Sequence, residues 1–304
     1  MIPWKFSFWT PGSPPSDDGA TFGCASHGLA APGIWSAPED SKALFASQSF
    51  QGEVIAGNYA EVLERLADLS YLPKAAIILF SRGAGAEAFL KQWQAGFPSV
   101  PVAGGAAASA PGEERGQLLP AAEDVALLLL SKGLWKSESL NVHEASGETW
   151  EFQSSDTRTI THLRRSTEGA WEHAWNPAAW EFRNLQHFCG RTAQDCESIT
   201  FSDANGRNLH CSISGTSLQV GADLPADGLL ILRTISPPEV TEKLRQFCAE
   251  PNTLVFGCAG LRSLLEVPFE IGSGSLAGFM FGELITLQGE PLFGNLMASR
   301  LREA

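Results

Sequence analysis

The stretch Ala75-Ala-Ile-Ile-Leu-Phe80, followed by Ser81-Arg-Gly-Ala-Gly85, decides the fold class that the sequence predicts. Six consecutive apolar residues are typical of a strand that is buried on both faces of a sheet. The small residues after it predict a turn, and the apolar spacing over residues 87–93 predicts a helix directly after that turn. Units of this kind indicate an α/β fold in which helices cover mixed sheets.

Other segments predict further elements of both kinds. Residues 100–103 and 125–130 are apolar runs of strand length, and residues 58–70 have the apolar spacing of a helix. In the second half the predicted elements are a hairpin, a buried strand and a helix that begins at two prolines: residues 198–202 with 208–214, 229–234 and 237–248.

Two short matches suggest that the two halves of the chain are related. Phe-Gly-Cys-Ala occurs at residues 22–25 and again at 256–259, and Val-Ala-Gly at 102–104 is similar to Leu-Ala-Gly at 276–278. Between these matches, residues 132–200 mix aromatic and charged residues without a clear period. We therefore predict two related α/β domains, residues 1–140 and 201–304, with a ligand cleft between them and an aromatic-rich connecting segment at residues 141–200.

The composition limits the classes of partner. The chain has 304 residues, a net charge of −13 at pH 7 and 44% hydrophobic residues, which is typical of a globular protein. The negative charge repels phosphate backbones and anionic lipids, so we expect neither nucleic acid nor a membrane as a partner. The N-terminus lacks a signal peptide, and no apolar run reaches the ~18–20 residues of a membrane span. These features predict a cytoplasmic location.

Several segments resemble the FIST family, a two-part small-ligand-binding sensory domain. In the second half these are Phe256-Gly-Cys258-Ala-Gly-Leu-Arg262, Gly278-Phe-Met-Phe281-Gly-Glu283 and Phe293-Gly-Asn295. In the first half, Cys24-Ala-Ser-His-Gly28 and Val102-Ala-Gly-Gly-Ala-Ala107 resemble the N-terminal part of the family. The resemblance spans roughly residues 20–130 and 200–300.

The resemblance implies a stand-alone sensory protein that binds a small molecule, an amino acid or a small anion, in the cleft. Because the chain carries no signalling module of its own, the signal would pass to a separate partner protein. Some family members bind haem and sense nitric oxide, so a haem-binding gas sensor is one alternative function. The predicted ligand-binding residues are Cys24, Ser26, His27, Gly104, Gly105, Cys258, Arg262, Phe281, Glu283 and Asn295.

Arg262 and Glu283 are the most chemically informative of these residues. A guanidinium suits a carboxylate and a glutamate suits an ammonium group, so the pair could bind both ends of an amino acid. The alternative is a structural ion pair between a helix start and a strand end.

Cys24 and Cys258 each follow an apolar strand and precede small residues. Entry into a helix there would lower the thiol pKa, and His27 stands three residues after Cys24 as a conceivable base. A divergent enzyme that uses one of these cysteines is therefore a second alternative. The other interpretation of both cysteines is a small buried thiol that fills a tight space.

The remaining cysteines and histidines do not predict a metal site. Structural zinc sites usually contain paired Cys-x2–4-Cys motifs, and the sequence contains none. Scattered cysteines in a chain of this length are typical of reduced thiols. Haem needs only one axial ligand, and five histidines could each supply it: His143, His162, His173, His187 and His210.

Overall fold

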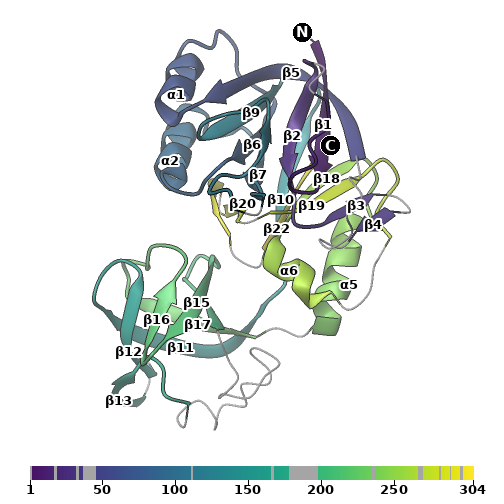
Figure 1. The fold of residues 1–304 in the computed structure, drawn as a ribbon. Coiled ribbons are helices and arrows are strands. Elements are labelled where there is room, and N and C mark those ends of the chain that lie inside the picture. The colour runs from purple at the N-terminus through teal and green to yellow at the C-terminus, as the bar shows by residue number, and fades with distance from the viewer. Residues whose placement is uncertain are drawn as a thin grey trace. The chain divides into compact units, whose positions relative to one another are not determined.

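The computed structural model divides the chain into two compact units (Figure 1). Unit 1 comprises Met1–Leu140 and Thr241–Ala304, and unit 2 comprises Asn141–Val240. The residues that the structure describes are 2–16, 19–31, 34–36, 46–110, 112–165, 168–177, 198–234, 237–265, 270–280, 282–287, 289–294 and 297–304. No helix in these ranges is long and apolar enough to cross a membrane.

Unit 1 contains two sheets. The larger has nine strands, in the order β21 (Glu290–Phe293), β20 (Glu283–Leu287), β7 (Val102–Ala106), β6 (Ala75–Phe80), β9 (Val125–Leu130), β5 (Ala46–Gly57), β1 (Ile2–Trp9), β2 (Thr21–Ala25) and β8 (Leu118–Leu119). The smaller has six strands, in the order β10 (Trp135–Asn141), β22 (Met297–Glu303), β18 (Thr253–Cys258), β19 (Leu276–Met280), β3 (Leu29–Ala31) and β4 (Ile34–Ser36).

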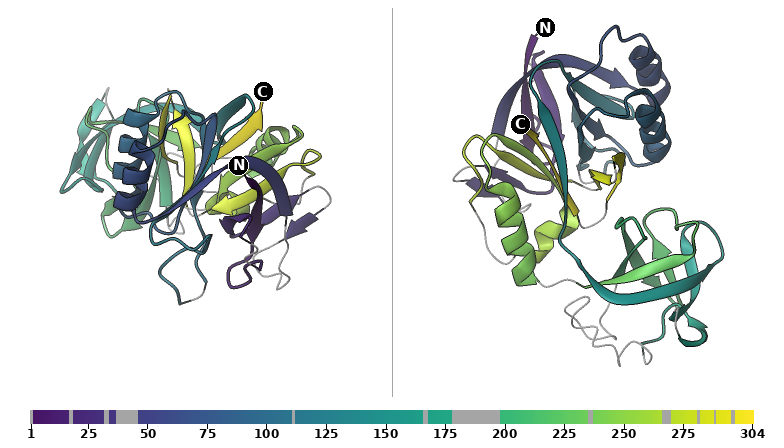
Figure 2. Two further views of the ribbon diagram at one scale, coloured as in Figure 1. Left: turned by 90° about the horizontal axis from the view of Figure 1, so that it is seen from above. Right: turned by 180° about the vertical axis from the view of Figure 1, so that it is seen from behind.

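The described helices that accompany these sheets are α1 (Tyr59–Ala67), α2 (Ala86–Gly96), α5 (Pro237–Cys248) and α6 (Ala259–Leu264). α1 begins at Asn58, whose side chain accepts a hydrogen bond from the backbone N–H of Glu61 in a capping box. α2 begins at Gly85, which has a φ of 84° and so favours glycine. Figure 1 and Figure 2 show α1 and α2 on one side of unit 1 and α5 on the other.

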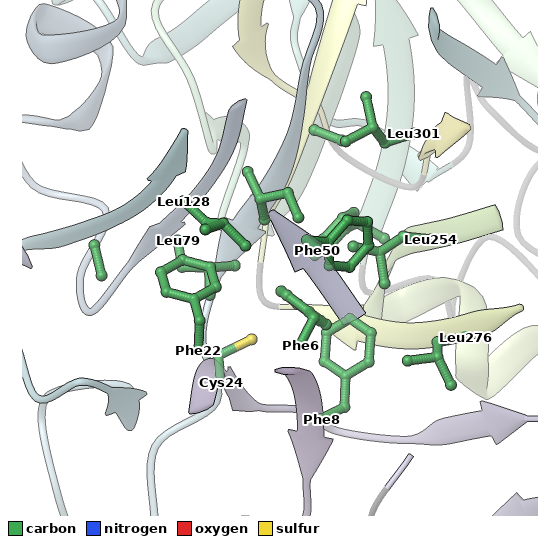
Figure 3. Close-up of a cluster of buried hydrophobic side chains, with 14 of the residues drawn as sticks. Phe6, Phe8, Phe22, Cys24, Phe50, Leu79, Leu128, Leu254, Leu276 and Leu301 are labelled. Carbon is green, nitrogen blue, oxygen red and sulfur yellow. The ribbon is translucent and has the colours of Figure 1, made fainter. Parts of the chain in front are cut away.

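The main core of unit 1 lies between side chains of the two sheets. Phe6, Phe8 and Phe22 of the nine-stranded sheet form one cluster with Leu254 of the six-stranded sheet (Figure 3). Phe256 of the six-stranded sheet belongs to the same cluster. The rings of Phe6 and Phe256 meet edge-on with centroids 5.8 Å apart. The opposite face of β6 and β9 packs against α1 and α2, which explains why these strands are apolar at every position.

The predicted α/β class with helices covering the sheets is wrong. Half of the described residues lie in strands and 15% in helices. The apolar runs do form buried strands, but the second sheet covers one of their faces where a helix was expected. A buried strand has the same sequence pattern whether a helix or another strand covers it, so the local pattern could not distinguish these two coverings.

Unit 1 contains one strand arrangement three times, built from segments of both halves of the chain. Each module begins with two parallel strands and ends with a strand antiparallel to the first. Between them lies an exported hairpin or short strand, which means one that pairs with a strand of another module. Module 1 is β1, β2, β3–β4 and β5; module 2 is β6, β7, β8 and β9; module 3 is β18, β19, β20–β21 and β22. Each exported strand pairs with the second strand of another module: β3 with β19, β8 with β2 and β20 with β7.

A glycine occupies the third position of the second strand in every module. Gly23, Gly104 and Gly278 stand in register with the neighbouring first strand of their own module. A Cβ at Gly23 or Gly104 would lie 1.9 Å from a backbone oxygen of that strand, and a Cβ at Gly278 would lie 2.5 Å from the Phe8 ring. Residues 102–104 and 276–278, which match in sequence, therefore occupy the same place in modules 2 and 3. The other matching pair does not, because residues 22–25 lie in the second strand of module 1 and residues 256–259 begin in the first strand of module 3.

Unit 2 is a sheet that closes on itself. Its order is β11 (Glu144–Ser154), β17 (Leu229–Thr234), β14 (Ser198–Ser202), β15 (Asn208–Ser214), β16 (Ser217–Val220), β12 (Thr159–Arg165) and β13 (Glu168–His173), and pairing of β11 with β12 closes six of the strands. Trp150, Ile160 and Phe201 are among the side chains that fill its interior. The predicted hairpin is present as β14 and β15, and segment 141–200 supplies β11, β12 and β13.

Candidate functional site

Eight of the ten predicted ligand-binding residues lie in the described part of unit 1, seven of them in or beside strands and Arg262 on α6. Phe281 and Asn295 lie outside the described residues. Six of the other eight lie beside one of two consecutive residues of β19, Phe279 and Met280, and Gly104 and Glu283 join them through Gly105. Because successive side chains of a strand point to opposite faces, these two residues divide the predicted set into two groups.

Ser26 is a structural link in the Phe279 group. Its hydroxyl donates to the carbonyl oxygens of Gly28 at 2.6 Å and Phe279 at 3.0 Å, and accepts from the Phe279 N–H at 2.7 Å. The His27 N–H also donates to the Phe279 carbonyl oxygen at 2.8 Å. Ser26 is buried, so these bonds explain its polarity without a ligand.

Arg262 belongs to the same group. Its Cγ and Cδ atoms lie 3.4 and 3.3 Å from the place that a Cβ on Gly28 would take, and the Phe279 ring lies 3.4 Å from the same place. Glycine at residue 28 therefore lets the arginine stem pass close to the backbone. The Arg262 side chain is half-buried on α6, and the neighbouring Leu261 is fully buried.

Cys24 and Gly105 belong to the Met280 group. The Cys24 thiol lies 3.8 Å from the Met280 sulfur, and a Cβ on Gly105 would lie 3.1 Å from the Met280 Cβ. Cys24 is fully buried, and this burial raises its pKa well above the usual range. A neutral, enclosed thiol is a poor nucleophile, so the geometry favours the packing interpretation for Cys24.

Glu283 is the most unusual residue of the site. It is fully buried at the start of β20, where it pairs with Gly105. Its Oε1 atom accepts a hydrogen bond of 2.7 Å from the Met297 N–H. Its Oε2 atom is also buried, and no described residue donates a hydrogen bond to it. A buried carboxyl with an unused oxygen is costly and needs an explanation.

Burial sets the protonation of Glu283. It raises the pKa of the carboxyl, while the backbone N–H groups of Glu283 and Met297 and the Cys258 thiol act in the opposite direction. No cation is among the groups that shift this pKa, so Arg262 does not act as its ionic partner. Arg262 and Glu283, which were predicted to bind an amino acid together, therefore do not form an ion pair with each other.

Cys258 completes the Met280 group. It ends β18 in register with Met280, so both side chains point to the same face of the sheet. Its side chain is half-buried, and its thiol opposes the rise that burial causes in the pKa of the Glu283 carboxyl. α6 begins directly after it.

Gly104 and Gly105 have backbone roles. Gly104 permits the close approach of β6 and β7, as described above. A Cβ on Gly105 would lie 2.6 Å from the Gly282 oxygen and 3.2 Å from the Glu283 Cα. Gly105 therefore lets β20 approach β7 closely enough to place Glu283 inside the unit.

The histidines considered for haem lie in unit 2, apart from His187, which is outside the described residues. His143 is buried with its Nδ1 atom 3.1 Å from the Asn208 amide nitrogen, and burial lowers the pKa of His210. His162 and His173 stack with their ring centroids 5.0 Å apart. Within the described ranges, no three His, Cys, Asp or Glu side chains are placed to hold a metal ion.

Met280, Met297 and Gly294 are parts of the site that sequence reasoning missed. Met297 contributes only its backbone N–H, and a Cβ on Gly294 would lie 2.8 Å from Glu283 Oε1. Neither role has a sequence signal, because both depend on which strands meet. The chain matches no protein-family model, and no curated protein is significantly similar to it.

Proposed function

We propose that this chain is a cytoplasmic sensory protein that binds a small molecule at Glu283 and signals through a separate partner protein. The observation that carries the proposal is the fully buried Glu283 carboxyl, one oxygen of which accepts no hydrogen bond from any described residue. A donor group on a ligand would satisfy that oxygen and offset part of the cost of burying it. The resemblance of the surrounding segments to FIST domains supports a ligand with an amino group, such as an amino acid.

Arg262 is proposed as a second contact of the ligand. It lies on α6, four residues after Cys258, and its guanidinium suits a carboxylate. A zwitterionic ligand could then use its ammonium group on Glu283 and its carboxylate on Arg262. Within this proposal, the Phe279 group holds Arg262 and the Met280 group holds Glu283.

Isothermal titration calorimetry of the purified chain with each natural amino acid tests the proposal. We expect at least one amino acid to bind, and Glu283→Gln to weaken that binding at least about 10-fold, because a charge-assisted hydrogen bond contributes ~1.5–3 kcal/mol. Glu290→Gln, an exposed glutamate on the neighbouring strand β21, is the matched control and should leave the affinity unchanged.

Arg262→Gln tests the second contact, with Arg245→Gln as its control. Arg245 lies on α5 and is ion-paired with Glu242 at 2.6 Å on an exposed surface. Loss of affinity in Arg262→Gln alone would support the zwitterion. If no amino acid binds, or if Glu283→Gln binds as tightly as the unmodified chain, the proposed function is wrong.

A further inference from the structure

A pair of histidines lies on the outer face of unit 2. His162 of β12 and His173 of β13 are direct partners across the two antiparallel strands, and their rings stack with centroids 5.0 Å apart. Phe152 and Leu163, the neighbouring pair on β11 and β12, pack into the interior of the unit, so His162 points outward. His162 is half-buried and His173 is exposed, so a dissolved ion can reach both rings.

The hydrogen bonds around His162 determine which of its ring nitrogens keeps a lone pair. The Thr161 hydroxyl donates its only proton to the Gln153 carbonyl oxygen at 3.2 Å and lies 3.2 Å from His162 Nδ1. The hydroxyl can therefore serve His162 only as an acceptor, and the neutral ring carries its proton on Nδ1. The lone pair is then on Nε2, to which no described residue donates. A histidine held in this way through its other nitrogen is typical of metal ligands.

His173 places a second imidazole at the distance that a shared ion requires. No side chain in the described ranges forms a hydrogen bond or an ion pair with the His173 ring. Two imidazoles that bind one ion through bonds of about 2.0–2.1 Å, at an angle of about 90–110°, have ring centroids roughly 4.5–5.2 Å apart. The observed 5.0 Å lies in this range. Rotation of the rings about their Cβ–Cγ bonds, which is soft, can therefore bring both nitrogens to one ion while the strands stay in place.

The charges around the pair allow a cation to approach. Arg164 lies two residues further along β12, but its Nε atom donates to Glu151 at 2.8 Å and its guanidinium lies 4.8 Å from the centre of the Trp171 ring. The positive charge of Arg164 is therefore offset by the Glu151 carboxylate. The chain as a whole has a net charge of −13, which attracts cations.

We propose that His162 and His173 bind one divalent transition-metal ion of the class of Zn²⁺, Ni²⁺ and Cu²⁺. Imidazole ligands suit these ions, whereas Mg²⁺ and Ca²⁺ prefer oxygen ligands. Water supplies the remaining ligands, because no cluster of three His, Cys, Asp or Glu side chains able to hold an ion occurs among the described residues. The ion joins β12 to β13, which is the last strand of its sheet and pairs within that sheet only with β12.

Isothermal titration calorimetry with NiCl₂ tests the proposal on the full chain without a polyhistidine tag. We expect one Ni²⁺ to bind per chain, and a tenfold excess of MgCl₂ should not displace it. His162→Gln and His173→Gln should each weaken the binding at least about 10-fold, because loss of a group that merely orients a metal ligand already costs about 10- to 100-fold in affinity.

His210→Gln is the matched control for these two variants. His210 is also in unit 2, and its Nδ1 atom lies 3.4 Å from the Thr200 hydroxyl, but it has no histidine partner across the strands, since its partner on β14 is Thr200. Its replacement should leave the affinity for Ni²⁺ unchanged. The proposal is wrong if the unmodified chain binds no Ni²⁺, or if either His162→Gln or His173→Gln binds it as tightly as the unmodified chain does.

Urea unfolding gives a second measurement. An ion that binds the folded chain stabilises it, so NiCl₂ should raise the urea midpoint of the unmodified chain and of His210→Gln. It should not raise the midpoint of His162→Gln or His173→Gln, and an equal rise in all four proteins would overturn the proposal. The inference is independent of the proposed function, because Glu283 and Arg262 belong to unit 1. A chain that binds no amino acid but binds Ni²⁺ through the two histidines would overturn only the proposed function.

Discussion

Modules 2 and 3 of unit 1 share a strand arrangement, but each buries a carboxyl group in a different way. In module 2, Asp124 precedes β9, and both of its carboxyl oxygens accept hydrogen bonds. Its Oδ1 atom accepts from Arg82 Nε at 2.8 Å and is paired with Arg82 Nη2 at 2.7 Å, and its Oδ2 atom accepts from the Tyr59 N–H at 3.3 Å. In module 3, the Met297 N–H reaches one oxygen of Glu283, and the other oxygen is unused by the described residues.

The difference shows which of the two carboxyl groups the fold itself explains. Asp124 ties the start of α1 and the end of β6 to β9, so its charge has a structural role. Glu283 gains too few partners to offset its full burial, which is typical of groups retained for binding or chemistry. The starts of strands β9 and β20 therefore carry buried carboxyl groups of two kinds, one with a full set of partners and one with an oxygen that the described residues do not use.

The largest expected effect comes from the backbone feature that the modules share. Gly104→Ala would place a Cβ 1.9 Å from the Ile78 oxygen, so β6 and β7 would have to separate. We expect a loss of about 3 kcal/mol or more in the free energy of unfolding, measured in urea. Gly83→Ala in the same module meets nothing within 4 Å and should change stability by less than ~0.5 kcal/mol. Equal stability of the two variants would contradict the shared close approach.

Asp124→Asn should have the next largest effect. It removes the charge that holds Arg82 and weakens the bond to the Tyr59 N–H, so we expect a loss of about 2 kcal/mol in the same measurement. The matched control is Glu123→Gln, because Glu123 is exposed and pairs with Arg115 at 3.5 Å on the surface. If the control costs as much as Asp124→Asn, the structural role of Asp124 is wrong.

Glu283→Gln should change the pH dependence of stability more than stability itself. Burial raises the pKa of Glu283 from 4.5 to about 8, so the folded chain holds a proton that the unfolded chain has released over this range. The contribution of Glu283 to stability therefore falls as pH rises from about 4.5 to about 8, by at most ~1.4 kcal/mol per pH unit.

Urea unfolding at pH 5, 6.5 and 8 measures that slope. We expect the unmodified chain to lose stability relative to Glu283→Gln as the pH rises, and Glu290→Gln to follow the unmodified chain. Parallel curves for all three proteins would show that Glu283 is ionised in the folded chain near neutral pH, and the contrast between modules 2 and 3 would then be smaller than the structure indicates.

Local patterns predicted many individual elements of the fold. The apolar runs at residues 75–80 and 125–130 are β6 and β9, the segment at 237–248 is α5, and the hairpin at 198–214 is β14 with β15. Each of these elements has its periodicity or end signals in its own residues. The strands β10 to β13 lack such signals, because their aromatic and charged residues are only half-buried in many positions.

The candidate site was less predictable than the elements. Gly104 and Gly105 were predicted as ligand-binding residues, whereas the structure shows both at places where another strand approaches closely. The grouping of Arg262 with Phe279, and of Glu283 with Met280, could not be inferred, because it depends on which face of β19 each neighbour meets.

The sequence by itself determined the buried strands and the approximate places of the helices, since these follow from side-chain periodicity within a few residues. The tertiary structure decided that a second sheet covers the first, that three modules exchange strands, which glycines another strand approaches closely, and that Glu283 is enclosed with one oxygen that no described residue uses. These features arise from pairing between segments up to about 250 residues apart, such as Cys24 with Met280. Such pairing is selected by the packing and hydrogen bonding of the whole unit, which no local pattern contains.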